Sequence, residues 1–170
     1  MRFEKVSFEA FKNDMAQYRP INFMAGQVEE AYDNIIIPKR KTKHSAGYDL
    51  RTPIDIVIPP GQARTIPTGI KAVFAEDEMN AWHLQIYVRS SVGIKDGVVL
   101  TNGTGIIDSD YQFGKNEGDM MLALRNMSEK HVKYKAGDRI CQAVFALHGI
   151  TVDDDAEGER TGGVGSTGRG

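Results

Sequence analysis

Two carboxylates and a tyrosine form the group of residues best suited to acid–base chemistry in this sequence. Asp108, Asp110 and Tyr111 follow a glycine-rich turn at residues 102–105. A carboxylate in such a place can act as a general base, and the aromatic ring can provide a stacking surface. The alternative is a turn in which the aspartates only cap backbone N–H groups.

The segment Arg89-Ser90-Ser91-x-Gly93 is a candidate anion site. It stands at the end of an alternating apolar pattern that begins near Trp82. A guanidinium and two hydroxyls beside a glycine suit an anion, because hydrogen bonds that involve a charged group are stronger than those between neutral groups. An ordinary polar turn is the competing interpretation.

The last residues are rich in glycine, with the spacing Gly163-x-Gly165-x-x-Gly168. A dinucleotide-binding site with this spacing needs a strand before it and a helix after it, and the sequence favours neither. Arg160, two hydroxyls and the backbone N–H groups can instead wrap a polyphosphate; a flexible linker end is the alternative. The two hydroxyls belong to Ser166 and Thr167.

The composition argues against several classes of partner. The formal net charge is −2 over 170 residues, which does not suit a surface that holds a nucleic-acid backbone. The four histidines have no metal-ligand spacing, which argues against zinc. Cys141 is the single cysteine, and no apolar run approaches membrane-spanning length. We therefore expect a soluble, cytoplasmic protein with no nucleic-acid or membrane partner.

The elements that must position these residues fall into three regions. Residues 6–19 predict an amphipathic helix with Ser7 as its N-cap, whose apolar side docks on the main body or on a neighbouring subunit. Its apolar positions are Phe8, Phe11, Met15 and Tyr18.

The middle region, residues 33–152, predicts many short strands separated by turn signals. Such a pattern indicates an all-β sandwich, barrel or jelly roll, so we expect one β domain over residues 1–152. Residues 153–170 lack apolar periodicity and predict a flexible, glycine-rich C-terminal arm. The strands are expected at residues 54–58, 82–88, 98–100, 120–124 and 140–147.

Five short motifs, in this order along the chain, resemble those of the trimeric dUTPase family. Each is weak alone, and their order makes the resemblance specific. It covers residues 46–168. The motifs are Ala46-Gly47-Tyr48-Asp49-Leu50, Arg89-Ser90-Ser91-Val92-Gly93, Gly105-Ile106-Ile107-Asp108-Ser109-Asp110-Tyr111, Gly137-Asp138-Arg139-Ile140-Cys141-Gln142 and Gly162-Gly163-Val164-Gly165-Ser166-Thr167-Gly168.

The resemblance implies a jelly-roll-like distorted barrel and a homotrimer whose active sites are shared between chains. It implies hydrolysis of dUTP to dUMP and pyrophosphate by attack of water on the α-phosphorus, which limits uracil in DNA. By analogy Asp108 activates the water, and Tyr111 packs under the deoxyribose and excludes a 2′-hydroxyl. The hairpin that contains Asn102 and Gly105 would read the uracil edge.

The resemblance also assigns the phosphate end of the substrate. Asp49 would hold Mg²⁺ indirectly, through water. A triphosphate with Mg²⁺ needs few dedicated protein ligands, because the ion keeps waters and binds the phosphates. The substrate-binding set would be completed by Arg89, Ser90, Ser91, Gly93 and Gln142 in the main body and by Arg160, Val164, Gly165, Ser166 and Thr167 in the arm.

Two departures and two rival functions accompany the resemblance. Val164 stands where the family usually carries a phenylalanine that closes over uracil, and residues 112–118 form a longer link than usual. A dCTP deaminase shares the fold, but its central motif continues with Asp-Pro-Gly, whereas here Ser109-Asp110-Tyr111 follows. The second rival is a module of this fold that also binds a regulatory protein, through the N-terminal helix or the longer loop.

Overall fold

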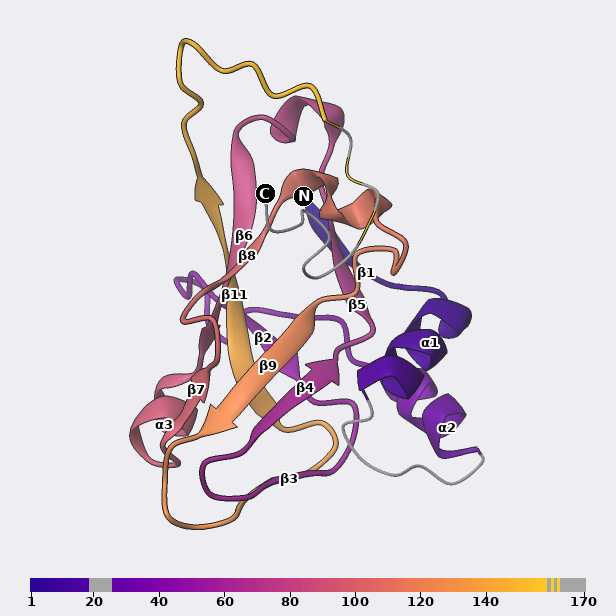
Figure 1. Ribbon diagram of the computed structural model, residues 1–170, viewed down its shortest axis with the longest axis vertical. Helices are drawn as coiled ribbons and strands as arrows, with labels where there is room; N and C mark the ends of the chain where they lie inside the picture. Colours follow the sequence, from indigo (N-terminus) through magenta and orange to yellow (C-terminus); the bar gives the residue numbers. More distant parts are fainter. Residues whose placement is uncertain (19–25, 159, 161, 163–170) are drawn as a thin grey trace.

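The computed structural model describes residues 1–18, 26–158, 160 and 162 of the chain, and it is built mainly of short antiparallel strands (Figure 1). The expected all-β class is confirmed, and the arrangement fits a jelly-roll-like distorted barrel. In the described ranges no helix has the length and apolar character needed to cross a membrane.

The largest sheet has four strands in the order β2-β11-β6-β8, with β11 and β6 at its centre. The alternating pattern predicted at residues 82–88 appears as β6, in which Leu84 and Ile86 are buried. Strand β11 pairs along seven residues with β6, from Cys141 opposite Val88 to Leu147 opposite Trp82. The strand bounds are β2 Tyr48–Arg51, β6 Trp82–Val88, β8 Gly105–Ile107 and β11 Arg139–Leu147.

Three smaller antiparallel sheets pack with the first around one apolar core. Their strand orders are β4-β9-β7, β1-β5 and β10-β3. The core is aliphatic, with Ile56, Ile58, Ile66 and Leu122 almost fully buried. The bounds are β1 Arg2–Lys5, β3 Ile56–Ile58, β4 Ala63–Pro67, β5 Ile70–Val73, β7 Val98–Leu100, β9 Met121–Asn126 and β10 Val132–Tyr134. Short helical segments are η1 Glu76–Glu78, α3 Ser90–Ile94 and η2 Ser109–Phe113.

The predicted N-terminal helix is present as α1, Phe8–Tyr18, and it docks on the body of its own chain. Ser7 is its N-cap, because the Ser7 hydroxyl accepts a hydrogen bond of 3.2 Å from the Ala10 N–H. Phe11 and Met15 are buried, and complete burial of a side chain of this size contributes roughly 1.5–3 kcal/mol.

A second helix, α2, Gln27–Asp33, was not expected from the sequence. It lies against α1 on one side of the β body (Figure 1), where Tyr32 contacts the rings of Phe8 and Phe11. Gly69, with a φ of +67°, faces this pair of helices. A Cβ at Gly69 would lie 2.3 Å from Ile35 Cδ1 and 3.1 Å from Phe11 Cδ2.

The turn expected around Asn102 is present, but the hairpin expected there is wrong. Strand β7 before the turn pairs with β9, whereas β8 after it pairs with β6, so the chain passes here from one sheet to another. Gly103 takes a φ of +75°, and its N–H donates to the Leu100 carbonyl. The glycine-rich sequence therefore permits a change of sheet rather than a two-stranded ribbon.

Candidate functional site

Asp108 lies at the junction between β8 and η2, with its side chain 54% exposed. It makes no side-chain cap hydrogen bond to η2, so the alternative of a merely capping aspartate is not supported. Its carboxylate instead pairs with the guanidinium of Arg160, which also pairs with Asp110 at 2.8 Å. An exposed carboxylate at a strand end, free of the turn backbone, is able to accept a proton from water.

Tyr111 lies in η2, in the turn that follows Asp108, and is buried. Its hydroxyl donates to the Asp119 carbonyl at 3.0 Å and accepts from the Asn116 amide at 3.0 Å. Burial is the main reason why the pKa of Tyr111 is raised to about 12. The ring is therefore held as a neutral, fixed surface, with the Arg160 guanidinium 5.6 Å from its centroid.

A pocket of about 260 Å³ opens beside these two residues. It collects the predicted residues Asn102, Gly105, Asp108, Tyr111 and Arg160 in one place. The remaining lining residues are Tyr18, Thr65, Ile86, Ile106, Ile107, Met121 and Ala123.

A second, wider pocket of about 530 Å³ adjoins the first. The two share Ile106, Asp108 and Arg160, so Arg160 borders both. The rest of its lining is Met79, Asn80, His83, Ser109, Asp110 and His148.

The predicted anion site forms a separate group around Asp49. Arg89 precedes the short helix α3, and its Nε lies 3.1 Å from Asp49 Oδ1. The Arg139 Nη1 lies 3.1 Å from Asp49 Oδ2. Asp49 therefore orients two guanidinium groups, and Gln142 is its register partner on β11. A Cβ at Gly47 would be 2.6 Å from Gln142 Oε1, so a larger residue there would displace the Gln142 side chain.

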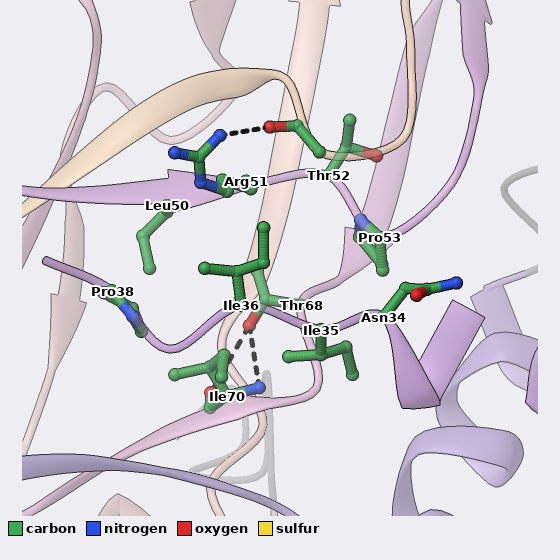
Figure 2. A pocket seen from close by; sticks show the side chains of 11 residues that line it. Asn34, Ile35, Ile36, Pro38, Leu50, Arg51, Thr52, Pro53, Thr68 and Ile70 are labelled. Carbon is green, nitrogen blue, oxygen red and sulfur yellow. Dashed lines mark hydrogen bonds between the residues drawn. The ribbon is translucent and has the colours of Figure 1, made fainter. Parts of the chain in front are cut away.

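The two groups are not joined within one chain. Both pockets lack Asp49, Arg89, Ser90 and Gln142 among their lining residues. A third cavity, between the end of α2 and β2 (Figure 2), is lined by residues such as Ile35 and Leu50 but has a volume of only about 10 Å³. That space suits about one water and no nucleotide.

Part of the predicted site lies outside the described residues. This holds for Val164, Gly165, Ser166 and Thr167, whose roles stay predictions. Across the described ranges, no three His, Cys, Asp or Glu side chains gather as a metal-binding cluster. The indirect metal role of Asp49 likewise stays a prediction.

Sequence reasoning missed three residues of this region. Tyr18 was assigned only to the apolar side of the N-terminal helix, yet it lines the pocket. Asn116 and Asp119 were not identified, although they hold Tyr111 in place. The available signal was the unusual length of residues 112–118, which marked the loop without revealing its contacts.

Comparisons of the chain with known families and proteins give consistent matches. The dUTPase family model matches residues 33–168. The chain is 42% identical to the deoxyuridine 5′-triphosphate nucleotidohydrolase of Lactococcus lactis over 147 residues, which cover 84% of this chain and 95% of that protein. The protein of the same name from Actinobacillus pleuropneumoniae is 42% identical over 141 residues, covering 78% and 87%.

Solved structures agree. The crystal structure of dUTPase from Streptococcus mutans superposes with a TM-score of 0.67 at 30% identity, covering 91% of this chain and all of that chain. A dUTPase from phage phi11 of S. aureus has a TM-score of 0.61 at 20% identity, covering 74% and 92%, and supports the fold alone.

Proposed function

This chain belongs to the dUTPase family, and we propose that the pocket around Asp108 and Tyr111 is where it hydrolyses dUTP to dUMP and pyrophosphate. The family is shown by the model match over residues 33–168 and by relatives that are themselves named deoxyuridine triphosphate nucleotidohydrolases. The observation that carries the residue assignment is the gathering of Asn102, Gly105, Asp108 and Tyr111 around one cavity.

Asp108 is the proposed general base. It takes a proton from a water molecule as the water oxygen bonds to the α-phosphorus, and the bond from that phosphorus to the bridging oxygen of pyrophosphate breaks. Phosphorus chemistry of this kind depends on positioning and charge stabilisation rather than on a nucleophilic side chain. The Arg160 guanidinium beside Asp108 supports a role for this arginine in holding phosphate oxygens once the substrate displaces the carboxylates.

Tyr111 is the proposed sugar-discriminating residue. Its two hydroxyl hydrogen bonds fix the ring, so it cannot rotate away from an added 2′-hydroxyl without breaking them. Asn102 and the backbone near Gly105 would hydrogen-bond the uracil edge. A site built in this way rejects cytosine, because its buried polar groups would be left unpaired.

The phosphate-binding residues are proposed to come from a neighbouring subunit of a homotrimer. Asp49 lies 3.1 Å from both Arg89 and Arg139. This group is separate from the pocket around Asp108 and Tyr111 of the same chain, which we call the nucleoside pocket. Ser90, Ser91, Gly93 and Gln142 would complete this group. A second chain would therefore have to bring it to the pocket, which supports shared active sites.

Mg²⁺ is the proposed cofactor. When bound with the triphosphate, the ion would neutralise charge on the phosphate oxygens. The donor set fits outer-sphere binding: the Asp49 carboxylate is already paired with two arginines, so it can hold the ion's waters more readily than the ion itself. Oxygen donors and retained waters are typical of Mg²⁺.

The C-terminal arm, residues 153–170, is proposed as a separate functional segment attached to the β domain of residues 1–152. Its residue Arg160 lies at both pockets, which supports an arm that closes over the site. Val164, Gly165, Ser166 and Thr167 would then contact the substrate.

A nucleotide panel tests the assignment. The protein is incubated with Mg²⁺ and dUTP, dCTP, dTTP or UTP, and both pyrophosphate and ammonia are measured. We expect pyrophosphate from dUTP alone. Equal turnover of the deoxynucleotides would contradict the proposed pocket, and ammonia from dCTP would indicate a deaminase.

A further inference from the structure

Helix α1 lies before the segment that the family model matches, which begins at residue 33. Its last residue, Tyr18, nevertheless lines the nucleoside pocket together with Asn102 and Tyr111. This placement gives the helix a surface on the pocket as well as on the apolar core. The contacts that hold α1 show how closely it is joined to the site.

The longer loop at residues 112–118 anchors the start of the helix. Glu117 Oε2 accepts from the Ser7 N–H at 2.8 Å, and Glu117 Oε1 accepts from the Ser7 hydroxyl at 2.6 Å. These bonds keep the pKa of Glu117 below its ordinary value. The helix that precedes the family-model match and the longer loop are therefore bound to each other.

A buried pair of carboxyls joins the middle of the helix to the same loop. Asp14 of α1 is 6% exposed and Asp119 is fully buried. Among the described residues, Oδ2 of each carboxyl receives no N–H or O–H donor, while the two side chains are hydrogen-bonded to each other. A carboxyl must be protonated to donate such a bond. Burial raises the pKa of both groups, which favours their protonated forms.

The pair of carboxyls is linked to Tyr111 through the main chain of Asp119 and the side chain of Asn116. The Asp119 carbonyl accepts the Tyr111 hydroxyl, and the Asn116 amide donates to Tyr111 and, at 3.2 Å, to the Asp119 carbonyl. Asn116 is also hydrogen-bonded to Asp14. Asp119 is fixed from its other side by the Gly69 N–H at 2.8 Å. Loss of the Asp14 carboxyl would therefore remove a contact from both residues that hydrogen-bond the Tyr111 hydroxyl.

We propose that helix α1 completes the nucleoside pocket, with Tyr18 contacting the bound nucleoside and Asp14 acting as a positioning residue for Tyr111. The proposal rests on the assignment of this pocket to the deoxynucleoside. It makes α1 part of substrate selection, so the helix acts on KM and on sugar choice rather than on the attack by water. Asp108, the proposed general base, is paired with Arg160 instead.

The Tyr18 contact is tested with Tyr18→Ala, Tyr18→Phe and the control Gln17→Ala, an exposed residue on the same turn. Tyr18→Ala should raise KM for dUTP about 3- to 10-fold, with kcat within about twofold, because aromatic contact is lost in ground and transition states alike. Tyr18→Phe should restore most of the affinity. The Kd of dUMP should rise as KM does, while the Kd of pyrophosphate stays unchanged. An unaltered dUMP Kd for Tyr18→Ala would overturn this contact.

The positioning role is tested with Asp14→Ala, Asp14→Asn and Met15→Ala, which removes a buried side chain of the same helix. Asp14→Ala should raise the UTP/dUTP ratio of kcat/KM at least about threefold. Asp14→Asn should restore the ratio, because its amide can donate to Asp119. Met15→Ala should lower the Tm without moving the ratio. If Met15→Ala and Asp14→Ala shift the ratio equally, Asp14 is only structural and the positioning role is overturned.

Tyr111→Ala separates failure of this inference from failure of the proposed function. If Tyr111→Ala leaves the UTP/dUTP ratio unchanged, the pocket itself has been misassigned. If Tyr111→Ala raises the ratio while the Tyr18 and Asp14 variants behave as wild type, the pocket stands and only the role of α1 is overturned.

Discussion

The buried pair Asp14 and Asp119 should give the protein a characteristic pH dependence of stability. Burial raises the pKa of Asp14 from its ordinary value of 3.8 to about 6. A carboxyl with a raised pKa contributes stability that is fully present below the unfolded pKa and is lost as pH rises through the folded pKa. The wild type should therefore lose more stability between about pH 4 and about pH 6 than the Asp14→Asn variant, in which the raised pKa of Asp119 is the contribution that remains.

The size of the loss follows from the pKa difference. Each pH unit inside this window costs about 1.4 kcal/mol per shifted group, so crossing the whole window costs about 3 kcal/mol. Among the described residues, the other titratable groups that interact with Asp14 are Asp119, Tyr18 and Tyr111. Because the two carboxyls interact, the loss belongs to the pair rather than to Asp14 alone.

The assay is urea unfolding of both proteins between about pH 4 and about pH 7.5, at one fixed protein concentration because an oligomer's stability depends on it. Glu117, Glu78 and Asp55 have lowered pKa values and lose their stabilising contribution as pH falls. They are present in both proteins, so their effect cancels in the difference. A wild-type minus variant difference that does not change with pH would refute the raised pKa of Asp14 in the folded protein.

Three further predictions concern the proposed site and its assembly. Asp108→Asn should lower kcat by roughly 10²- to 10⁴-fold with the Tm unchanged, since the amide is a very poor proton acceptor; steady-state rates within about threefold of wild type would show that Asp108 is not the base. Deletion of residues 159–170 should reduce kcat/KM more than any change at position 164, because it also removes Arg160; a truncated protein with wild-type kcat/KM would make the arm a linker end. Val164→Phe should instead tighten dUTP binding a few-fold by adding an aromatic contact. Sedimentation should show a trimer, and an active monomer would contradict the shared site.

Local rules were enough where a feature depends on neighbouring residues. The period-two pattern at residues 82–88 predicted β6 because side chains alternate between the two faces of a strand, and Ser7 predicted the helix start because its hydroxyl can cap an N–H. Helix α2 was missed because its local signals are weak. It has only seven residues and begins after Gly26, which makes no side-chain cap.

Contacts between distant segments were beyond local rules. The motifs identified Asp49 and Arg89, but not that Asp49 pairs with both Arg89 and Arg139, since those pairs depend on the packing of β2, β6 and β11. Helical spacing placed Tyr18 on an apolar face without showing which cavity that face borders. The prediction of a hairpin at Asn102 was wrong. Turn residues predict that the chain reverses direction, but packing in the core decides which strand each neighbouring strand pairs with.

The contact between Gly69 and the N-terminal helix should leave a detectable pattern of residues in the sequences of relatives. A side chain at Gly69 would need the space held by Ile35 and Phe11, so these three positions are coupled by volume. Relatives that keep the helix should retain glycine at position 69, or should combine a larger residue there with smaller ones at positions 11 or 35. Relatives without the helix should lose the part of this constraint that comes from Phe11, while Ile35 and the positive φ, which asparagine also tolerates, still limit the residue at position 69. Covariation among these positions would then record when the helix was acquired and whether it was ever lost.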